Sequence, residues 1–152
     1  MSIFSTGVYN NIFNATGLKT LFANGIIEIY TGAAPANADN AVTGTLLCTI
    51  TKASGAFVAG TATNGINFDA PVLRVISKAA AETWSGNAVA TGTAGWARFK
   101  ANGVDAGGSS TTLPRIDMSI GVSSGDLRLA TVALVSGAPV IVQSYTFTGV
   151  TP

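Results

Sequence analysis

The sequence has no histidine, a single cysteine and few charges, and each shortage excludes a class of function. Without histidine, the chain lacks the commonest general base and the commonest metal ligand. Cys48 has no partner for an intramolecular disulfide or a cysteine-built metal site, and in the run TLLCTIT we expect a buried, inert thiol. Charged residues make up 10% of the chain and the net charge is +1, so we expect neither a nucleic-acid partner nor a membrane partner.

Long apolar runs are also missing. No stretch approaches the roughly 18–20 residues of a membrane span. The first residues, MSIFSTGVYNN, show no basic region followed by an apolar core, so no secretory signal is indicated. We therefore expect a protein that is made in the cytoplasm and stays there or is released by lysis.

Small side chains are what the chain has in excess: Ala, Gly, Ser and Thr make up nearly half of its 152 residues. A soluble monomer commonly carries about 25% charged residues. Here either hydroxyl groups or neighbouring subunits must cover the surface, and the positive mean hydropathy favours subunits, hence a homo-oligomer. The length fits one hydrophobic core.

Two alternating runs, separated by a loop rich in Gly, Ser and Thr, lie between Gly95 and Ile120. Alternation is typical of half-buried strands, because successive side chains point to opposite sides. We expect one face to be buried (Ala97, Phe99, Ile116, Met118, Ile120) and the other to be wet (Trp96, Arg98, Lys100, Arg115, Asp117, Ser119). An exposed cross-strand pair between Arg98 or Lys100 and Asp117 would contribute about 0.2–1 kcal/mol. Residues 101–114 are expected to form a surface loop.

The N-terminal residues 1–14 follow neither a helical nor a strand period, and we expect an extended arm. Because it is apolar, the arm should lie on its own sheet or on a neighbouring subunit. Its candidate inter-subunit contacts are Ile3, Phe4, Val8, Tyr9, Ile12 and Phe13. A short helix is expected over residues 16–24, capped by Thr16 and stopped by Gly25 in a left-handed conformation.

Strand signals recur along the rest of the chain, at residues 26–32, 45–51, 66–68, 72–77, 126–130, 131–135 and 140–148. With the central pair they give about eight to ten strands separated by turn residues, which favours a sandwich or jelly roll. The predicted fold is therefore all-β: one antiparallel, jelly-roll-like sandwich over residues 15–152, preceded by the arm.

Residues able to carry chemistry are few. Asn37, Asp39 and Asn40 suggest a calcium loop but lack its paired acids and closing glutamate, so we expect a turn held by its own side chains. No two acids have a spacing that predicts a glycosidase pair, so we assign no catalytic, cofactor or metal residue and expect no enzyme. Trp84 and Trp96 are possible stacking platforms for sugars, although a core position is commoner.

Four segments together carry a resemblance: GLKTLFANGIIEIYTGAAPANADNAVTGTLLCTIT, INFDAPV, AETWSGNAVATGTAGWARF and PRIDMSIGVSSGDLRL. They resemble a group of small β-rich proteins encoded among the virion structural genes of tailed bacteriophages. The resemblance extends from Gly17 to Phe147 and is most specific in IYTGAAPANAD and TGTAGWARF. It implies a virion component, closest to a capsid-decorating or cementing protein with a jelly-roll-like sandwich.

The function implied is structural: the protein would bridge neighbouring subunits of the major capsid protein at the capsid surface, as a homo-oligomer on the shell. Deleting residues 1–13 is then expected to leave a folded domain that no longer binds capsids. A phage tail or baseplate component is the first alternative. A carbohydrate-binding module that uses Trp84 or Trp96 is the second.

Overall fold

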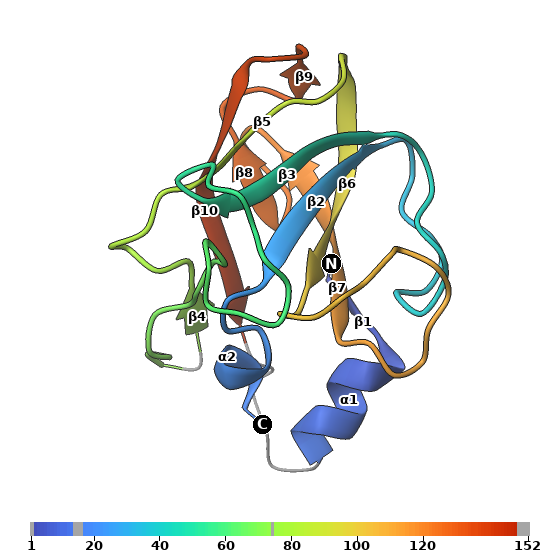
Figure 1. Cartoon of the computed structure of the whole chain (residues 1–152), viewed down its shortest axis with the longest axis vertical. Helices are drawn as coiled ribbons and strands as arrows, with labels where there is room; N and C mark the ends of the chain where they lie inside the picture. Colours follow the sequence, from blue (N-terminus) through green and yellow to red (C-terminus); the bar gives the residue numbers. More distant parts are fainter. Residues whose placement is uncertain (1, 14–16, 74, 149–152) are drawn as a thin grey trace.

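The main strands pair with one another in a closed ring. The structure is a computed structural model that describes residues 2–13, 17–73 and 75–148. In this part of the chain, seven strands form a closed mixed β-barrel (Figure 1). In ring order they are β2 (Ile26–Thr31), β3 (Leu46–Lys52), β5 (Trp84–Asn87), β10 (Pro139–Thr148), β8 (Leu127–Leu129), β7 (Arg115–Gly121) and β6 (Gly92–Lys100). The predicted all-β class is confirmed, whereas the jelly-roll sandwich is not confirmed.

Only one pairing in the ring, β7 with β8, is parallel. The remaining neighbours in the ring are antiparallel. The β7–β8 pairing is short, since it involves only Ile120 with Leu127 and Gly121 with Arg128. Strand β8 therefore covers only the end of this β7 edge, and the part before Ile120 is left for another strand.

The barrel interior is built from rows of apolar side chains in register. Ile27 lies opposite Phe99, which lies opposite Ile116, and all three are fully buried. Ala97 and Met118 belong to the next row and are also buried. The apolar face predicted for the two central strands is thus confirmed as the core side, where burying one large side chain contributes about 1.5–3 kcal/mol.

The N-terminal segment completes the barrel wall. Strand β1 (Ile3–Phe4) pairs antiparallel with β7, with Ile3 opposite Asp117 and Phe4 opposite Ile116. The ring of Phe4 lies 5.1 Å from that of Phe147 on β10, measured between centroids. Strand β1 therefore fills the edge of β7 that β8 leaves unpaired.

Residues 6–13 form helix α1 (Thr6–Phe13), so the extended arm predicted there is wrong over this range. Ser5 caps the helix: its Oγ accepts a hydrogen bond of 3.2 Å from the Val8 N–H. Asp39 stabilises the same end, accepting hydrogen bonds from the Thr6 N–H (2.8 Å) and the Thr6 hydroxyl (2.5 Å). Because Asp39 is distant in sequence, local periodicity could not reveal this cap. Residue 14 lies outside the described residues.

The second helix is shorter than predicted, spanning only α2 (Leu18–Leu21), and Thr16 lies outside the described residues. The left-handed residue after it is Asn24, with φ of 58°, and not Gly25. Gly25 is required for a different reason: a Cβ there would meet the Lys100 carbonyl oxygen at 2.4 Å. Asparagine tolerates the left-handed region better than most residues, so the two roles are divided between neighbours.

Two further short strands lie outside the ring. Strand β4 (Val75–Ser77) pairs with the end of β10, and β9 (Ala133–Leu134) pairs with the start of β6. The predicted strand over residues 66–68 contributes only isolated bridges, at Ile66 and Phe68. These pieces flank the barrel without changing its closure.

Candidate functional site

Two long loops cover the outer face of β2, β6 and β7. Residues 33–44 connect β2 to β3, and residues 101–114 connect β6 to β7. The Val42 N–H donates to the Gly107 carbonyl at 2.9 Å, and the Ser110 N–H donates to the Asp39 carbonyl at 2.8 Å. We call these two segments the loop layer; they run in cyan and ochre at the right of Figure 1. The loop layer lies over the strand face that the sequence predicted to be wet.

The charged face of the central strands is buried, so its predicted exposure to solvent is wrong. Arg98, Lys100, Arg115 and Asp117 are each at most 3% exposed. Alternation in sequence shows that two faces differ, but it does not show which other segment covers the polar one. A charge taken out of water must be paired and hydrogen-bonded. Each of these residues has an ion-pair partner, although Nη1 of Arg115 is a buried donor without a hydrogen bond.

Arg98 and Asp117 form a bidentate pair at directly opposed positions of β6 and β7. Nε of Arg98 donates to Oδ1 of Asp117 at 2.6 Å, and Nη2 donates to Oδ2 at 2.8 Å. The remaining nitrogen, Nη1, donates to the Asn40 carbonyl at 2.9 Å. One guanidinium thus joins both central strands to the loop layer.

A second network lies beside this pair. Nζ of Lys100 lies 2.6 Å from Oε2 of Glu28 and donates to the Asp105 carbonyl at 3.0 Å. Nε and Nη2 of Arg115 donate to the Asp105 carboxylate at 2.7 and 2.5 Å, and the Tyr30 hydroxyl donates to Glu28. Through Asp105, this network fastens the 101–114 half of the loop layer to the barrel.

Charge state follows from these contacts. Burial by itself would raise the pKa of Asp105, but hydrogen bonds from Arg115 and from the Gly107 N–H, with the nearby Lys100 charge, outweigh it and hold the pKa below its ordinary value. Burial, and then the adjoining Glu28 carboxylate, raise the pKa of Tyr30, so its hydroxyl stays protonated and acts as a donor. Asp105 is therefore ionised at neutral pH, while Tyr30 is a neutral donor.

Both tryptophans are buried. Trp96 is 1% exposed and stacks on Tyr30, with ring centroids 4.8 Å apart and planes 17° from parallel. The Arg98 guanidinium lies 5.4 Å from the Trp96 ring on the same strand. Trp84 is fully buried among Phe68 and other core rings. Neither tryptophan offers an open ring face to a sugar in this structure.

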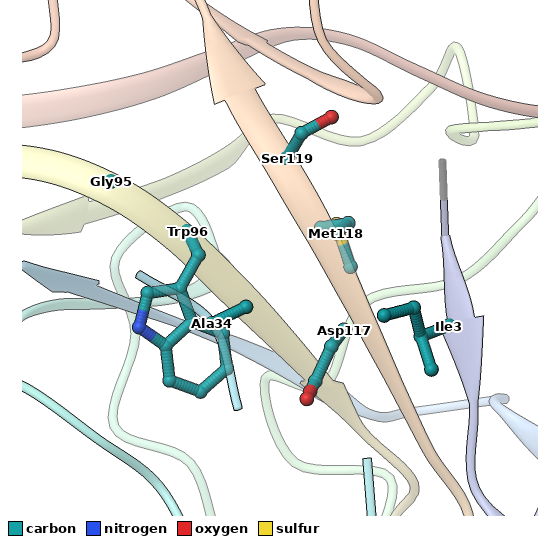
Figure 2. A pocket seen from close by; sticks show the side chains of 7 residues that line it. All are labelled: Ile3, Ala34, Gly95, Trp96, Asp117, Met118 and Ser119. Atoms are coloured by element: carbon teal, nitrogen blue, oxygen red, sulfur yellow. The ribbon is translucent and has the colours of Figure 1, made fainter. Parts of the chain in front are cut away.

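A small hollow of about 160 Å³ lies at the edge of the loop layer. Its wall is formed by Ile3, Ala34, Gly95, Trp96, Asp117, Met118 and Ser119. Figure 2 shows Trp96 and Asp117 side by side on β6 and β7, with Ile3 beside them on β1. Since Arg98 already binds both oxygens of Asp117, the hollow presents no free acid for catalysis. Among the described residues, no group of three or more His, Cys, Asp or Glu is placed to hold a metal ion.

The residues predicted to contact other subunits lie on the barrel itself. Ile3 and Phe4 pair with β7 and are half-buried, and Val8 is fully buried in the core. Tyr9 and Ile12 are 50% and 37% exposed on α1, the most exposed of the candidate contacts whose side chains are described. The Phe13 side chain lies outside the described part. Within one molecule, Ile3 and Phe4 lie on the protein's own sheet, and contact of this segment with a neighbouring subunit stays a prediction.

Cys48 lies in the core, and residues 37–40 form a turn. Cys48 is fully buried, and burial raises the pKa of its thiol to about 11, which matches the expected inert thiol. In the turn, the Asp39 N–H donates to Oδ1 of Asn37 at 2.9 Å and the Asn40 N–H to the Asn37 carbonyl at 3.0 Å. The self-stabilised turn is thereby confirmed. No helix within the described ranges has the length and apolar character to cross a membrane.

The exposed surface carries very little charge. Among the charged residues that the structure describes, only Lys19, Lys52, Asp69 and Arg128 are exposed. The exposed residues of the loop layer are uncharged: they are Ala, Gly, Ser, Thr, Asn and Val, including Val104 at 83% exposure. We therefore take this loop surface, held rigidly by the ion pairs beneath it, as the candidate interaction surface.

Sequence reasoning missed the partners that make this surface rigid. The sequence analysis assigned no partner to Glu28 or Asp105 and only a local turn to Asp39. Glu28 pairs with Lys100 and Asp39 caps Thr6, both distant in sequence, whereas Asp105 binds Arg115 at the far end of its own loop. One signal was available: a chain with so few charges places several of them in the two most regular strands, which suggests that they are paired. Searches for a matching family model, a similar curated protein and a similar solved structure found none.

Proposed function

We propose that this protein is a virion structural protein that decorates or cements the capsid of a tailed bacteriophage by bridging neighbouring subunits of the major capsid protein. It acts at the capsid surface as a homo-oligomer on the shell, after synthesis in the host cytoplasm. Its contribution is mechanical, and its partner is the shell. The family resemblance of its sequence is the origin of this proposal.

The supporting observation is the distribution of charge. The central strands keep their ion pairs inside, while the exposed surface is made mostly of small, uncharged side chains. Proteins that remain free in solution generally rely on exposed charge to stay apart. A surface of this kind suits a protein that spends its working life packed against other subunits.

The buried network also supports a bridging role. Arg98 and Asp105 hold the two halves of the loop layer to the barrel, so the surface is ordered before it meets a partner. Ordering a contact surface in advance lowers the entropic cost of binding. Repetition over a shell then multiplies modest contacts into high avidity. A closed barrel provides this as well as the jelly-roll sandwich that the resemblance implies.

Deleting the gene from the phage tests the proposal. We expect purified wild-type particles to contain many copies per shell by quantitative mass spectrometry, with density on the capsid in an image reconstruction. Particles that lack the protein should release their genome at lower temperature, and the wild-type gene supplied in trans should restore heat resistance. Absence of the protein from particles, or density confined to the tail, would reject the capsid role.

A further inference from the structure

One exposed segment combines an unfavourable backbone conformation with a large apolar side chain in solvent. The Val72 N–H and the Val75 N–H each donate to the other residue's carbonyl at 2.9 Å, and Leu73 lies in the turn that these bonds close. Leu73 is 89% exposed and has φ of +49°. Val72 beside it is 67% exposed, and Pro71 is exposed as well. The hairpin carries β4 at the lower left of Figure 1, at the periphery of the molecule.

The tip breaks two preferences at once. Two-residue hairpins favour Asn, Asp and Gly at positions of positive φ, where a leucine is strained. A large apolar side chain also belongs in the interior, yet Leu73 has the highest exposure of the large hydrophobic residues in the described part. Sites that violate local preference without internal compensation are the places where a functional contact is expected.

A second turn in the same molecule shows what compensation looks like. Ala53 and Ser54 also have positive φ, of 51° and 57°. Their groups are engaged, since the Ala53 N–H donates to the Thr83 carbonyl at 2.8 Å and the Ser54 hydroxyl bonds that of Ser85 at 2.9 Å. That turn is anchored to the strand beside it, whereas Leu73 points its side chain into solvent.

We propose that Leu73, flanked by Pro71 and Val72, is an apolar anchor that inserts into a pocket repeated on the protein shell to which this molecule attaches. This inference rests on the proposed function and names the contact. Three side chains at a turn bury far less than the roughly 800 Å² per partner of a stable two-protein interface. A free dimer is therefore not the expected partner of this turn. The expected partner is a surface that presents many identical pockets, because avidity accumulates there.

Co-sedimentation with empty shells produced without this gene provides the test. The wild-type protein and the variants Leu73→Asn and Leu73→Gly are compared, because both substitutions suit positive φ and preserve the turn. We expect each variant to bind the shells at least about tenfold more weakly at each site, as one buried leucine side chain allows. Val135→Asn, at an exposed valine between β9 and β10 and outside the loop layer, is the matched control and should bind within about twofold of wild type.

The outcomes separate the two proposals. Equal binding by wild type and both Leu73 variants overturns the anchor and leaves the capsid role intact. Failure of the wild type itself to bind shells overturns both. Light scattering of the protein alone tests for binding to a second copy of the chain. Flotation with phosphatidylcholine and phosphatidylglycerol vesicles tests for binding to a lipid surface. Leu73-dependent dimers or Leu73-dependent vesicle binding would reject a shell pocket.

Discussion

The guanidinium of Arg98 and the carboxylate of Asp117 face each other across β6 and β7 through two hydrogen bonds, and their side chains are 0% and 1% exposed. The same guanidinium holds the Asn40 carbonyl of the loop layer. This pair therefore lies beneath the surface proposed to contact other subunits. Its energetics decide how firmly that surface is held.

Replacing Asp117 with alanine should be strongly destabilising. The substitution leaves the Arg98 charge buried without its carboxylate, so we expect the free energy of unfolding to fall by about 3–5 kcal/mol. From the sequence, with the pair taken as exposed, the expected loss was under about 1 kcal/mol. Urea denaturation of the two purified proteins, followed by tryptophan fluorescence, measures the difference.

Two further variants serve as controls for Asp117→Ala. Arg128 is exposed, so Arg128→Ala should change the free energy of unfolding by no more than about 0.5 kcal/mol. The double variant Arg98→Met with Asp117→Leu removes both charges, and it should recover much of the stability that Asp117→Ala loses. A loss below about 1 kcal/mol in Asp117→Ala would show that the pair is solvated.

Strands β6 and β7 match the sequence-based prediction on their core face and not on their polar face. The alternation from Trp96 to Lys100 correctly separated the core side, where Ala97 and Phe99 are buried. It could not reveal the cover over the other side, because contacts such as Arg98 with Asn40 join residues far apart in the chain. Local patterns predict which faces differ, whereas tertiary packing decides which of them reaches water.

The N-terminal segment shows the same limit. Helix α1 begins where Ser5 and Asp39 cap it, and Asp39 lies in another loop. Strand β1 also pairs with β7, which joins the start of the chain to its last third. Ser5 is a local capping signal that the sequence analysis did not use, whereas the Asp39 cap and the β1–β7 pairing have no local signature. The sequence therefore predicted strands well and their closure poorly.

Acid should weaken the loop layer through Asp105. A carboxyl group whose pKa is lower in the folded than in the unfolded chain contributes stability that is complete above the unfolded pKa and is lost as pH falls through the folded one. For Asp105 the ordinary value is 3.8 and the folded pKa lies below it. We therefore expect stability to decline below about pH 5, most steeply under about pH 4.

The variant Asp105→Asn isolates this contribution. At pH 7 it should be less stable by about 3–5 kcal/mol, because Arg115 loses its carboxylate. Its free energy of unfolding should also fall less than that of the wild type between pH 5 and acid. Some acid sensitivity should remain, since the pKa values of Glu82 and Asp126 are lowered too. Identical pH slopes in both proteins would contradict a role for Asp105.

Deleting residues 1–13 should damage the fold itself. The deletion removes β1 from the edge of β7, the fully buried Val8 from the core, and the Ser5 hydroxyl that accepts from the Arg115 N–H at 2.9 Å. We expect a loss of at least about 3 kcal/mol, from the apolar burial alone, or no cooperative unfolding transition. Circular dichroism during heating measures the change.

This result would replace the sequence-based expectation that the deleted protein stays folded. Ser5→Ala is the milder companion variant, with an expected loss of about 1–3 kcal/mol from its unsatisfied buried partners. If the deleted protein unfolds at the same temperature as the wild type, the segment is an independent arm after all. Loss of capsid binding after the deletion would indicate a direct contact only if the deleted protein is as stable as the wild type.

Leu73→Asn should stabilise the protein, in contrast to the other substitutions. A leucine with φ of +49° pays a conformational cost of about 1–2 kcal/mol that asparagine largely avoids. The side chain is 89% exposed, so its removal takes no packing away from the core. We expect a gain of about 1 kcal/mol and a melting temperature higher by about 2–4 °C.

Leu73→Ala is the matched control: alanine has the same strain at positive φ, so it should give little or no gain. Stabilisation by asparagine together with weaker shell binding would show that the leucine is kept at the expense of stability, and destabilisation by asparagine would contradict the strained turn.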